Sequence, residues 1–359
     1  MTTNRKVDYI IIGQGLAGSA VAVQLLRRGK KILVIDQPAK NNSSRIAAGL
    51  FNPITGKKMV KTWMADEVFP YLHQFYREVE SVCKTSFFYP TPLYRPFISI
   101  EEQNEWMARS ADVAFKSYVS EVFTHSTVPQ VNDPDGGLVV QQCGYLNTTE
   151  YILSVRQWIS REGTFLEEDF TEESLKIDTS HVEYNGWTAP RIIFCQGTRQ
   201  SRWFEWIPIR PLKGETISIS ADVETAYVIN RGVYIVPAGV NKHFRVGATY
   251  FFQDRSEVCT DLARRELEEK LGQLISFPFR VIGQDWGFRP TTPDRRPIMG
   301  QHPDLKPLAV FNGLGTKGVS LAPYFSDVLI RSLENSGTLN NAVDVSRYKS
   351  VYWSVPKIV

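Results

Sequence analysis

The sequence predicts an α/β fold in which a parallel sheet is interrupted by an inserted, mainly antiparallel α+β unit. Three observations support this prediction. The chain begins with an apolar run that ends in a glycine-rich turn and continues as a helix. A second succession of apolar strand, glycine-rich turn and helix lies near the other end, at residues 308–323. Between them, short alternating runs punctuated by proline and glycine are typical of antiparallel strands.

The N-terminal turn has the pattern G-x-G-x-x-G at Gly13, Gly15 and Gly18, between the strand-forming run Val7–Ile12 and a predicted helix over Ser19–Arg28. Gly13 permits the tight turn, Gly15 lets a pyrophosphate approach the backbone, and Gly18 lets the helix lie close to the sheet. The N-terminus of the helix then faces the phosphates with unpaired N–H groups. These features favour a Rossmann-like dinucleotide site over an ordinary glycine turn.

A second predicted strand, Lys31–Ile35, ends at Asp36. A carboxylate at this position can accept hydrogen bonds from both hydroxyls of an adenosine ribose, and it would repel a 2′-phosphate. Because strand, helix, second strand and acid all stand in the expected order, we expect Asp36 to bind the ribose. The residues themselves leave open which dinucleotide is bound.

The composition argues against several other classes of protein. The formal net charge of +3 is too small to favour a nucleic-acid or membrane surface, although it excludes neither. The four cysteines are far apart with no C-x-x-C, and the five histidines never pair at ligand spacing, so no metal site is expected. Free thiols of this kind indicate a cytoplasmic protein. No run is long and apolar enough to predict a membrane span.

After Asp36, residues 41–53 begin with polar side chains and continue with small ones. Their hydroxyls, one guanidinium and exposed backbone amides suit a phosphate or the polar edge of a flat ring. A plain capped loop would account for the same residues. Apolar residues at helical spacing then predict a helix over residues 63–82, which Pro70 should kink or restart.

The middle of the chain is predicted to alternate between strands and helices. One helix has a cap at Thr260 and an apolar stripe of Leu262, Leu267, Leu271 and Leu274. The expected elements, in order, are strands at Phe87–Tyr89, Leu93–Phe97 and Leu138–Val140, a helix over Thr149–Glu162 closed by Gly163, a buried parallel strand over 191–198, a meander at Glu215–Ser220, Ala226–Asn230, Val233–Pro237 and His243–Tyr250, and a helix over Thr260–Leu274.

The last third contains the most specific pattern. Trp286–Gly300 reads W-G-F-R-P-T-T-P-D-R-R-P-I-M-G, and Leu308–Pro323 then supplies a strand, the glycine-rich turn at residues 313–318 and the start of a helix. A turn of this kind presents backbone amides to an anion or a carbonyl edge.

Together these segments resemble the D-amino-acid oxidase and glycine oxidase family of FAD-dependent oxidoreductases. The resemblance rests on the N-terminal turn, the acid after the second strand, the Ser44–Leu50 segment, the strand that ends at Gly197, and the two C-terminal pieces. Asp36 is a departure, because glutamate is commoner there. The C-terminal pieces also resemble the FAD domain of the bifunctional enzyme that modifies the tRNA wobble uridine.

The resemblance implies that FAD is bound without a covalent link, because no cysteine or histidine falls within a flavin-contacting motif. Lys317 is then expected near N1 and the C2 carbonyl of the flavin, with a surface lysine as the alternative. The expected cofactor-binding residues are Gly13, Gly15, Leu16, Ala17, Gly18, Asp36, Ser44, Arg45, Ala48, Gly49, Leu50, Gly197, Gly313, Gly315, Thr316, Lys317, Gly318 and Val319.

The resemblance also implies oxidation of a small amine or amino acid, a glycine derivative or a D-amino acid, by hydride transfer to flavin N5. Arg289 is the expected clamp for the substrate carboxylate, and a structural salt bridge is the alternative. Tyr234 and Tyr250, on neighbouring strands, are expected to line the pocket or only to pack there. Two other functions stay open: a tRNA-modifying flavoenzyme acting on carboxymethylaminomethyl-uridine, and a flavin-binding protein without turnover.

We therefore expect two domains, each assembled from separate stretches of chain. Residues 1–85, 141–205 and 283–359 are predicted to form the FAD-binding domain, and residues 86–140 and 206–282 the substrate-binding domain. The expected partner is a small-molecule amine, and tRNA is less favoured because the net charge is low.

Overall fold

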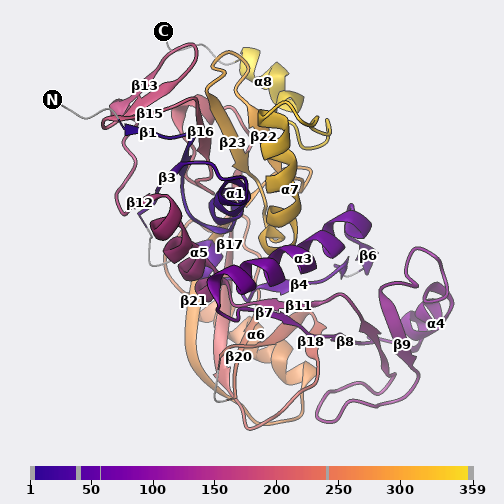
Figure 1. Ribbon diagram of the computed structural model, residues 1–359. Coiled ribbons are helices and arrows are strands. Elements are labelled where there is room, and N and C mark those ends of the chain that lie inside the picture. Colours follow the sequence, from indigo (N-terminus) through magenta and orange to yellow (C-terminus); the bar gives the residue numbers. More distant parts are fainter. Residues whose placement is uncertain (1–4, 38–41, 57, 240–241, 355–359) are drawn as a thin grey trace.

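The computed structural model describes residues 5–37, 42–56, 58–239 and 242–354. Two large sheets dominate it, one above the other in Figure 1. The upper sheet has six strands in the order β12-β3-β2-β16-β23-β22, and the lower sheet has eight. Neighbours in the six-stranded sheet are parallel except β22, which is antiparallel to β23. The mixed α/β fold predicted from the sequence is confirmed.

The six-stranded sheet is built from short apolar strands that come from distant parts of the chain. Successive residues point to opposite faces, so Ile11 packs under the helices α1 (Leu16–Arg27) and α7 (Gly318–Leu333), while Ile10 faces the opposite core. The strands are β2 (Tyr9–Ile12), β3 (Ile32–Ile35), β12 (Thr164–Leu166), β16 (Arg191–Phe194), β22 (Ile298–Gln301) and β23 (Leu308–Asn312). The predicted buried strand that returns beside the first one is β16, which lies between β2 and β23.

Helices cover one face of this sheet. They are α1 (Leu16–Arg27), α3 (Ala65–Cys83), α5 (Thr148–Glu162) and α7 (Gly318–Leu333). Helix α1 starts three residues before the predicted Ser19, directly after the N-cap Gly15. Gly163 caps α5 as predicted. Pro70 lies inside α3 and does not restart it, because the helix continues through to Cys83.

The other face of the six-stranded sheet is covered by a small sheet in the order β1-β15-β14-β13 and by the aromatic segment around Phe204. Its strands are β1 (Arg5–Lys6), β13 (Leu175–Ile177), β14 (Val182–Tyr184) and β15 (Trp187–Ala189). Short elements complete the chain: α2 (Ser43–Ile46), α4 (Ile100–Arg109), α8 (Lys349–Ser354), β5 (Ile54–Thr55), β6 (Val60–Lys61) and the 3-10 turns at Glu172–Ser174, Arg202–Phe204 and Val345–Tyr348.

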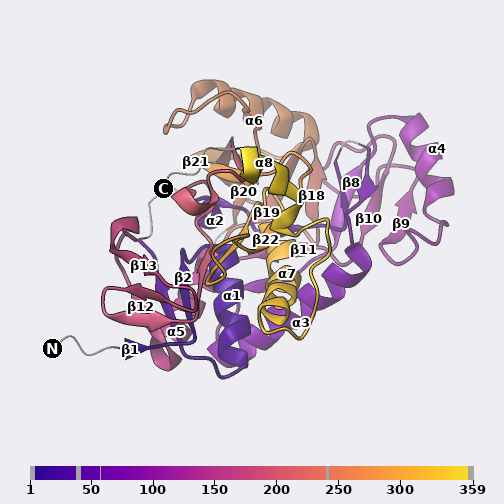
Figure 2. The same ribbon diagram turned by 90° about the horizontal axis from the view of Figure 1, so that it is seen from above.

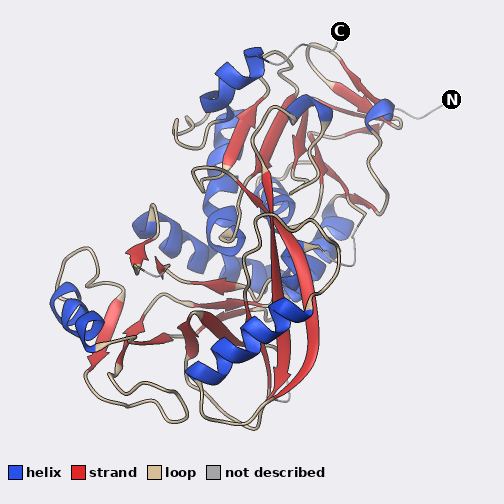
Figure 3. Ribbon diagram, turned by 180° about the vertical axis from the view of Figure 1, so that it is seen from behind, coloured by secondary structure: helices blue, strands red, loops and turns tan. Residues whose placement is uncertain are grey.

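The eight-stranded sheet has the order β21-β17-β20-β19-β18-β8-β10-β9 and is antiparallel except for the β18–β8 pair. Its strands are β8 (Leu93–Pro96), β9 (Val119–Phe123), β10 (Gly137–Val140), β17 (Arg210–Ser220), β18 (Val228–Arg231), β19 (Val233–Pro237), β20 (His243–Gly247) and β21 (Arg280–Thr291). The two longest, β17 and β21, curve behind helix α6 (Asp261–Leu274) in Figure 3.

Helix α6 packs on the face of this sheet that points away from α1 (Figure 2). Thr260 caps it, as predicted, by accepting a hydrogen bond from the Ala263 amide. Leu262, expected in the apolar stripe, is 68% exposed, and Ala263 is buried in its place. The opposite face of the sheet is left for a cavity.

Two strand predictions differ from the structure. The predicted strand His243–Tyr250 ends at Gly247, so Tyr250 lies in the following loop. The run at residues 87–89 forms β7 (Phe88–Pro90), which pairs with β11 (Gly144–Leu146) in a separate three-stranded sheet that also contains β4 (Leu50–Phe51). It therefore does not join the large antiparallel sheet. The domain boundaries proposed from the sequence stay predictions.

Candidate active site

A cavity of about 1950 Å³ lies between the two sheets. Four strands of the six-stranded sheet, β2, β3, β16 and β23, end at it, and their carboxyl ends are where open α/β sheets bind ligands. Residues of β17, β19 and β21 line its other side. Of the predicted site residues, all line this cavity except Gly18 and Arg45. The structure thus brings together residues from both ends of the sequence.

The G-x-G-x-x-G turn meets two different demands. Gly13 has φ +92°, and a Cβ on it would stand 2.7 Å from the Cys195 carbonyl oxygen on the neighbouring strand. A Cβ on Gly18 would stand 1.8 Å from the Gly13 carbonyl oxygen, so this glycine serves the contact between helix and turn and not the cavity. The first N–H groups of α1 have no acceptor within the helix, and Leu16 and Ala17 at this end of the helix line the cavity.

Asp36 follows β3 at the edge of the cavity and is largely buried, with 12% of its side chain exposed. Burial raises the pKa of this carboxyl group, although the Gln14 backbone N–H and the charges of Arg156 and Arg45 oppose the rise. Arg156 lies 3.7 Å from it and donates a hydrogen bond to the Gln14 side chain at 2.9 Å. Arg45, which does not line the cavity, therefore acts on this end through its charge.

The segment after Asp36 reaches the cavity through α2 and β4. The Leu16 amide donates to Ser44 Oγ at 3.1 Å, so Ser44 caps the N-terminus of α1 from outside the helix. Gly49 has φ +73°, and a Cβ there would stand 1.8 Å from the Leu146 carbonyl oxygen. The residue is glycine because β11 passes so close, while Ala48 and Leu50 line the cavity beside it.

The second glycine-rich turn lies opposite the first. The Gly315 amide donates to the Pro290 carbonyl at 2.9 Å, so this N–H is used inside the protein. Asn312, which the sequence did not single out, donates to the Gly197 carbonyl and accepts from the Gly313 amide, both at 2.8 Å. It thereby joins the turn after β16 to the turn after β23. Thr316, Gly318 and Val319 line the cavity beyond it.

Lys317 lies at the start of α7 and donates to Thr62 Oγ1 at 3.1 Å. Burial, helped by the charge of Arg295, lowers the pKa of its ammonium group. A lysine in such surroundings is no surface residue, and its positive charge is available to an electron-rich group in the cavity.

Side chains on and beside the antiparallel sheet form the other side of the cavity. The Arg289 guanidinium lies 4.8 Å from the centre of the Tyr250 ring, and its Nη1 donates to the Thr249 carbonyl at 3.2 Å. No ion pair involves Arg289 among the residues that the structure describes, so a structural salt bridge is absent there. Burial raises the pKa of Tyr234 to about 12, against the opposing charge of Arg289, so its hydroxyl stays protonated at neutral pH. Tyr250 is 55% exposed and covers the guanidinium from the solvent side.

The Asp36 end of the cavity fits the adenosine part of a flavin dinucleotide. At the Asp36 end, Gln196 and Glu168 line it, and one side-chain oxygen of each is buried without a hydrogen-bond partner among the described residues. Hydroxyl and amino groups of an adenosine would satisfy such acceptors. Gly197 has φ +61° and open space around its Cα, which leaves room for a ligand against the backbone.

The chain matches the family described as "FAD dependent oxidoreductase" (DAO) over residues 8–331, and it belongs to that family. It is therefore an FAD-dependent oxidoreductase, with FAD as its cofactor. It is similar to the tRNA 5-methylaminomethyl-2-thiouridine biosynthesis bifunctional protein MnmC of Hydrogenovibrio crunogenus, 25% identical over 83% of this chain and 47% of that protein. The chain spans about half the length of the curated relatives that it matches.

Solved structures share the fold at lower identity. The glycine oxidase of Geobacillus kaustophilus superimposes with a TM-score of 0.77 and 18% identity, over 96% of this chain and 98% of that one. The iminodiacetate oxidase of Chelativorans sp. BNC1 gives a TM-score of 0.76 and 20% identity, over 95% and 98% of the two chains. The predicted family and the predicted cofactor are thus confirmed.

Within the described residues, no group of three or more His, Cys, Asp or Glu side chains is placed to hold a metal ion. None of the helices in that part of the chain is long and apolar enough to cross a membrane.

Proposed function

We propose that this chain oxidises a small amine that carries a carboxylate, such as a glycine derivative or a D-amino acid. The observation that supports the proposal is the Arg289 guanidinium at the cavity. One of its donors is used by the Thr249 carbonyl, and the described residues offer it no carboxylate. A planar guanidinium with free donors suits a carboxylate ligand.

The residues around the substrate then have three tasks. FAD, when bound, accepts the hydride from the carbon beside the nitrogen. Arg289 holds the carboxylate and so fixes that carbon relative to the ring. Trp286 and Phe288, packed edge to face at 5.4 Å, and the rings of Tyr234 and Tyr250 exclude water from the cavity.

The amine proton needs no base from the protein. Among the described residues that line the cavity there is no histidine, and the Tyr234 hydroxyl stays protonated because its pKa is raised to about 12. We infer that the substrate binds with its nitrogen neutral, so that the lone pair forms the C=N bond as the hydride leaves. The resulting iminium ion hydrolyses in water, which takes up the proton. The catalytic efficiency should therefore rise with pH until the substrate amine is deprotonated.

The test is anaerobic mixing of the FAD-loaded protein with glycine, N-methylglycine and D-alanine, each compared with its carboxylate-free counterpart. The absorbance of oxidised flavin should disappear with at least one of the three acids and persist with methylamine, dimethylamine and ethylamine. Equal reduction by an acid and its counterpart would contradict the role of the carboxylate. Persistence with all of them would contradict the proposed substrate class.

A second candidate is a modified tRNA uridine that carries a carboxymethylaminomethyl group, which is also a secondary amine with a carboxylate. The observation in its favour is the charge of the cavity lining, where cations outnumber acids: Arg95, Arg199, Arg210, Arg231, Arg255, Lys270, Arg289, Arg295 and Lys317 against Asp36, Glu168, Asp169 and Glu257. Phosphates favour such a lining. RNA containing the modified uridine should then reduce the flavin, and the rate should fall steeply with added salt.

A further inference from the structure

The Arg289 guanidinium lies flat against strand β17. In the antiparallel pair of β17 and β21, Leu212 is opposite Arg289 and Gly214 is opposite Gly287. A Cβ built on Gly214 would stand 2.2 Å from Nη1, 2.3 Å from Nη2 and 2.4 Å from Cζ of Arg289. The guanidinium therefore occupies the space that any other residue at position 214 would fill.

The collision at Gly214 differs from most others in this protein, because all three of the atoms it meets belong to the end of a flexible side chain. The φ angle of Gly214 is outside the left-handed region, so alanine is compatible with the backbone there. An added methyl group should thus move the guanidinium and leave the sheet intact.

The segment that begins at Thr249 forms the opposite wall of this slot. Its backbone follows β17, with the Thr249 amide donating to the Glu215 carbonyl at 3.1 Å and the Phe251 amide donating to the Lys213 carbonyl at 3.0 Å. Between these two anchors, Tyr250 turns its ring over the guanidinium, and the Thr249 carbonyl accepts from Nη1.

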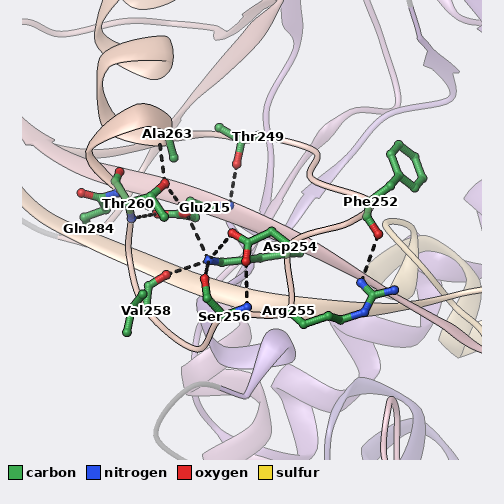
Figure 4. A network of polar contacts seen from close by, with 11 residues as sticks. Glu215, Thr249, Phe252, Asp254, Arg255, Ser256, Val258, Thr260, Ala263 and Gln284 are labelled. Atoms are coloured by element: carbon green, nitrogen blue, oxygen red, sulfur yellow. Dashed lines mark hydrogen bonds and ion pairs between the residues drawn. The ribbon is translucent and has the colours of Figure 1, made fainter.

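Lys213 fastens the same segment from the other face of β17. Its side chain is fully buried, and Nζ donates to Asp254 Oδ2 at 2.7 Å, to Ser256 Oγ at 2.7 Å and to the Val258 carbonyl at 2.8 Å. All three donors of the ammonium group are thus used by one loop. Figure 4 shows Asp254, Ser256 and Val258 converging on this point beside Glu215.

Glu215 extends the fastening to the start of α6. It is fully buried and accepts from the Thr260 amide at 2.8 Å, the Thr260 hydroxyl at 2.9 Å and the Gln284 side chain at 2.8 Å. Lys213 and Glu215 thus hold both ends of the loop between residues 249 and 260. Buried charges cost desolvation energy, and apolar residues would hold the sheet together equally well.

We propose that β17 positions the carboxylate clamp through two neighbouring residues: Gly214 leaves the slot in which the Arg289 guanidinium lies, and Lys213 fastens the loop that closes the slot with Thr249 and Tyr250. The inference rests on the proposed function, in which Arg289 binds the substrate carboxylate. Gly214 and Lys213 are positioning residues, because they act through Arg289 and not on the substrate.

The main test uses Gly214→Ala in the FAD-loaded protein, with Gly283→Ala as its control. Gly283 lies on β21, and its Cβ would meet only Ser218 at an ordinary 3.7 Å. Acetate is titrated while the flavin absorption spectrum is followed. Gly214→Ala should weaken acetate binding by about tenfold or more, the loss expected when one charged hydrogen bond is misaligned. FAD content and Tm should not change, and Gly283→Ala should match the wild type.

Turnover and a double variant separate positioning from a general structural effect. For N-methylglycine, Gly214→Ala should raise KM more than it lowers kcat. In an Arg289→Ala background, Gly214→Ala should have no further effect on acetate binding, because the group that it displaces is gone. The proposal is overturned if the two substitutions weaken acetate binding independently of each other. It is also overturned if Arg289→Ala loses acetate binding while Gly214→Ala binds acetate as tightly as the wild type. If Arg289→Ala also binds acetate normally, the clamp itself is refuted and the proposed function fails with it.

The loop contact is tested with Asp254→Asn, which keeps an acceptor for Lys213 but removes the charge. Its control is Asp222→Asn, because Asp222 pairs with Lys242 on the surface and lies outside the cavity lining. Asp254→Asn should weaken acetate binding by about two- to fivefold, and Asp222→Asn should not. Unchanged acetate binding in Asp254→Asn would remove the Lys213 contact from the proposal.

Discussion

The two ends of the cavity are built in different ways. At the nucleotide end, a Cβ added to Gly13, Gly18 or Gly49 would collide with a backbone carbonyl oxygen. At the substrate end, a Cβ added to Gly214 would collide with the movable end of Arg289. The nucleotide end therefore depends on close contacts between backbone segments. The substrate end consists of side chains on a sheet, and this sheet should stay folded when those side chains are removed. A substitution at the nucleotide end should lower both the free energy of unfolding and the affinity for FAD. A substitution at the substrate end should weaken only the binding and turnover of the substrate.

The largest effect should come from Arg289→Ala. If the guanidinium binds a carboxylate in a water-poor cavity, its loss should cost about 2 to 5 kcal/mol, or roughly thirty- to several-thousand-fold in kcat/KM. FAD content and Tm should stay at the wild-type values. The check is to measure kcat/KM with N-methylglycine and with dimethylamine. Dimethylamine has no carboxylate, so its kcat/KM should fall little further in the variant. If removing the guanidinium and removing the carboxylate lower kcat/KM additively, Arg289 has another role and the contrast between the two ends fails.

Gly18→Ala should instead lower stability and FAD content. Its methyl group would meet the Gly13 carbonyl oxygen at 1.8 Å, and because backbone must move, we expect a loss of about 1 to 3 kcal/mol or more in the free energy of unfolding. FAD content should fall with it. Gly272→Ala, in α6 with open space around it, is the matched control and should be neutral or slightly stabilising. Thermal unfolding of the two variants as apoproteins measures the difference. Equal Tm values would show that the backbone contact at Gly18 does not contribute to stability.

Asp36→Asn should weaken FAD binding by about 1 to 3 kcal/mol, because an ionised acceptor for the ribose is lost. In the free protein, burial raises the pKa of this carboxyl above its ordinary value. Folding therefore shifts the protonation of this carboxyl to higher pH, and only its ionised form can accept hydrogen bonds from both ribose hydroxyls. FAD affinity should consequently fall as the pH is lowered through that raised pKa, earlier than for an exposed aspartate. Titrations of apoprotein with FAD across pH check this, and a pH dependence that persists in Asp36→Asn would assign it to another group.

Ser44→Ala should have the smallest effect. Removing the Oγ that accepts from the Leu16 amide should cost about 0.5 to 1 kcal/mol in the stability of the apoprotein, as for other helix caps. Ser43→Ala is the control, since Ser43 also lines the cavity but has no hydrogen bond of its side chain among the described residues. Urea unfolding of the two variants measures the difference. A larger loss in Ser43→Ala would show that the cap is not what Ser44 provides.

The two ends also differ in how much of each could be predicted from the sequence. Gly13, Gly18 and Asp36 lie within one stretch of chain, so their spacing already defines the turn, the helix and the end of the second strand. Arg289 was placed by resemblance, but its surroundings depend on the register of β17 against β21 and on a loop that crosses β17. No local pattern gives that register. The predicted strand through Tyr250 was wrong for the same reason, because the chain leaves β20 at Gly247 to form this loop.

Some predicted site residues also have a structural task. Gly49 and Gly315 both line the cavity, but Gly49 in addition lets β11 approach, and the Gly315 amide is bonded to the Pro290 carbonyl. The sequence carries no signal that Lys213 and Glu215 are buried, since charged residues in an alternating strand normally face solvent. Their burial becomes visible only when the partner loop is placed, which requires tertiary structure.

The order of the strands also bears on how the protein is made. The central strand β2 pairs with β16, and β16 in turn pairs with β23, which ends at Asn312. On the ribosome, the N-terminal turn and helix therefore emerge long before the strands that complete their sheet. Until then the edge of β2 that will pair with β16 is open to wrong partners. The cavity, which both glycine-rich turns line, is therefore complete only after β23 and the turn that follows it have been made.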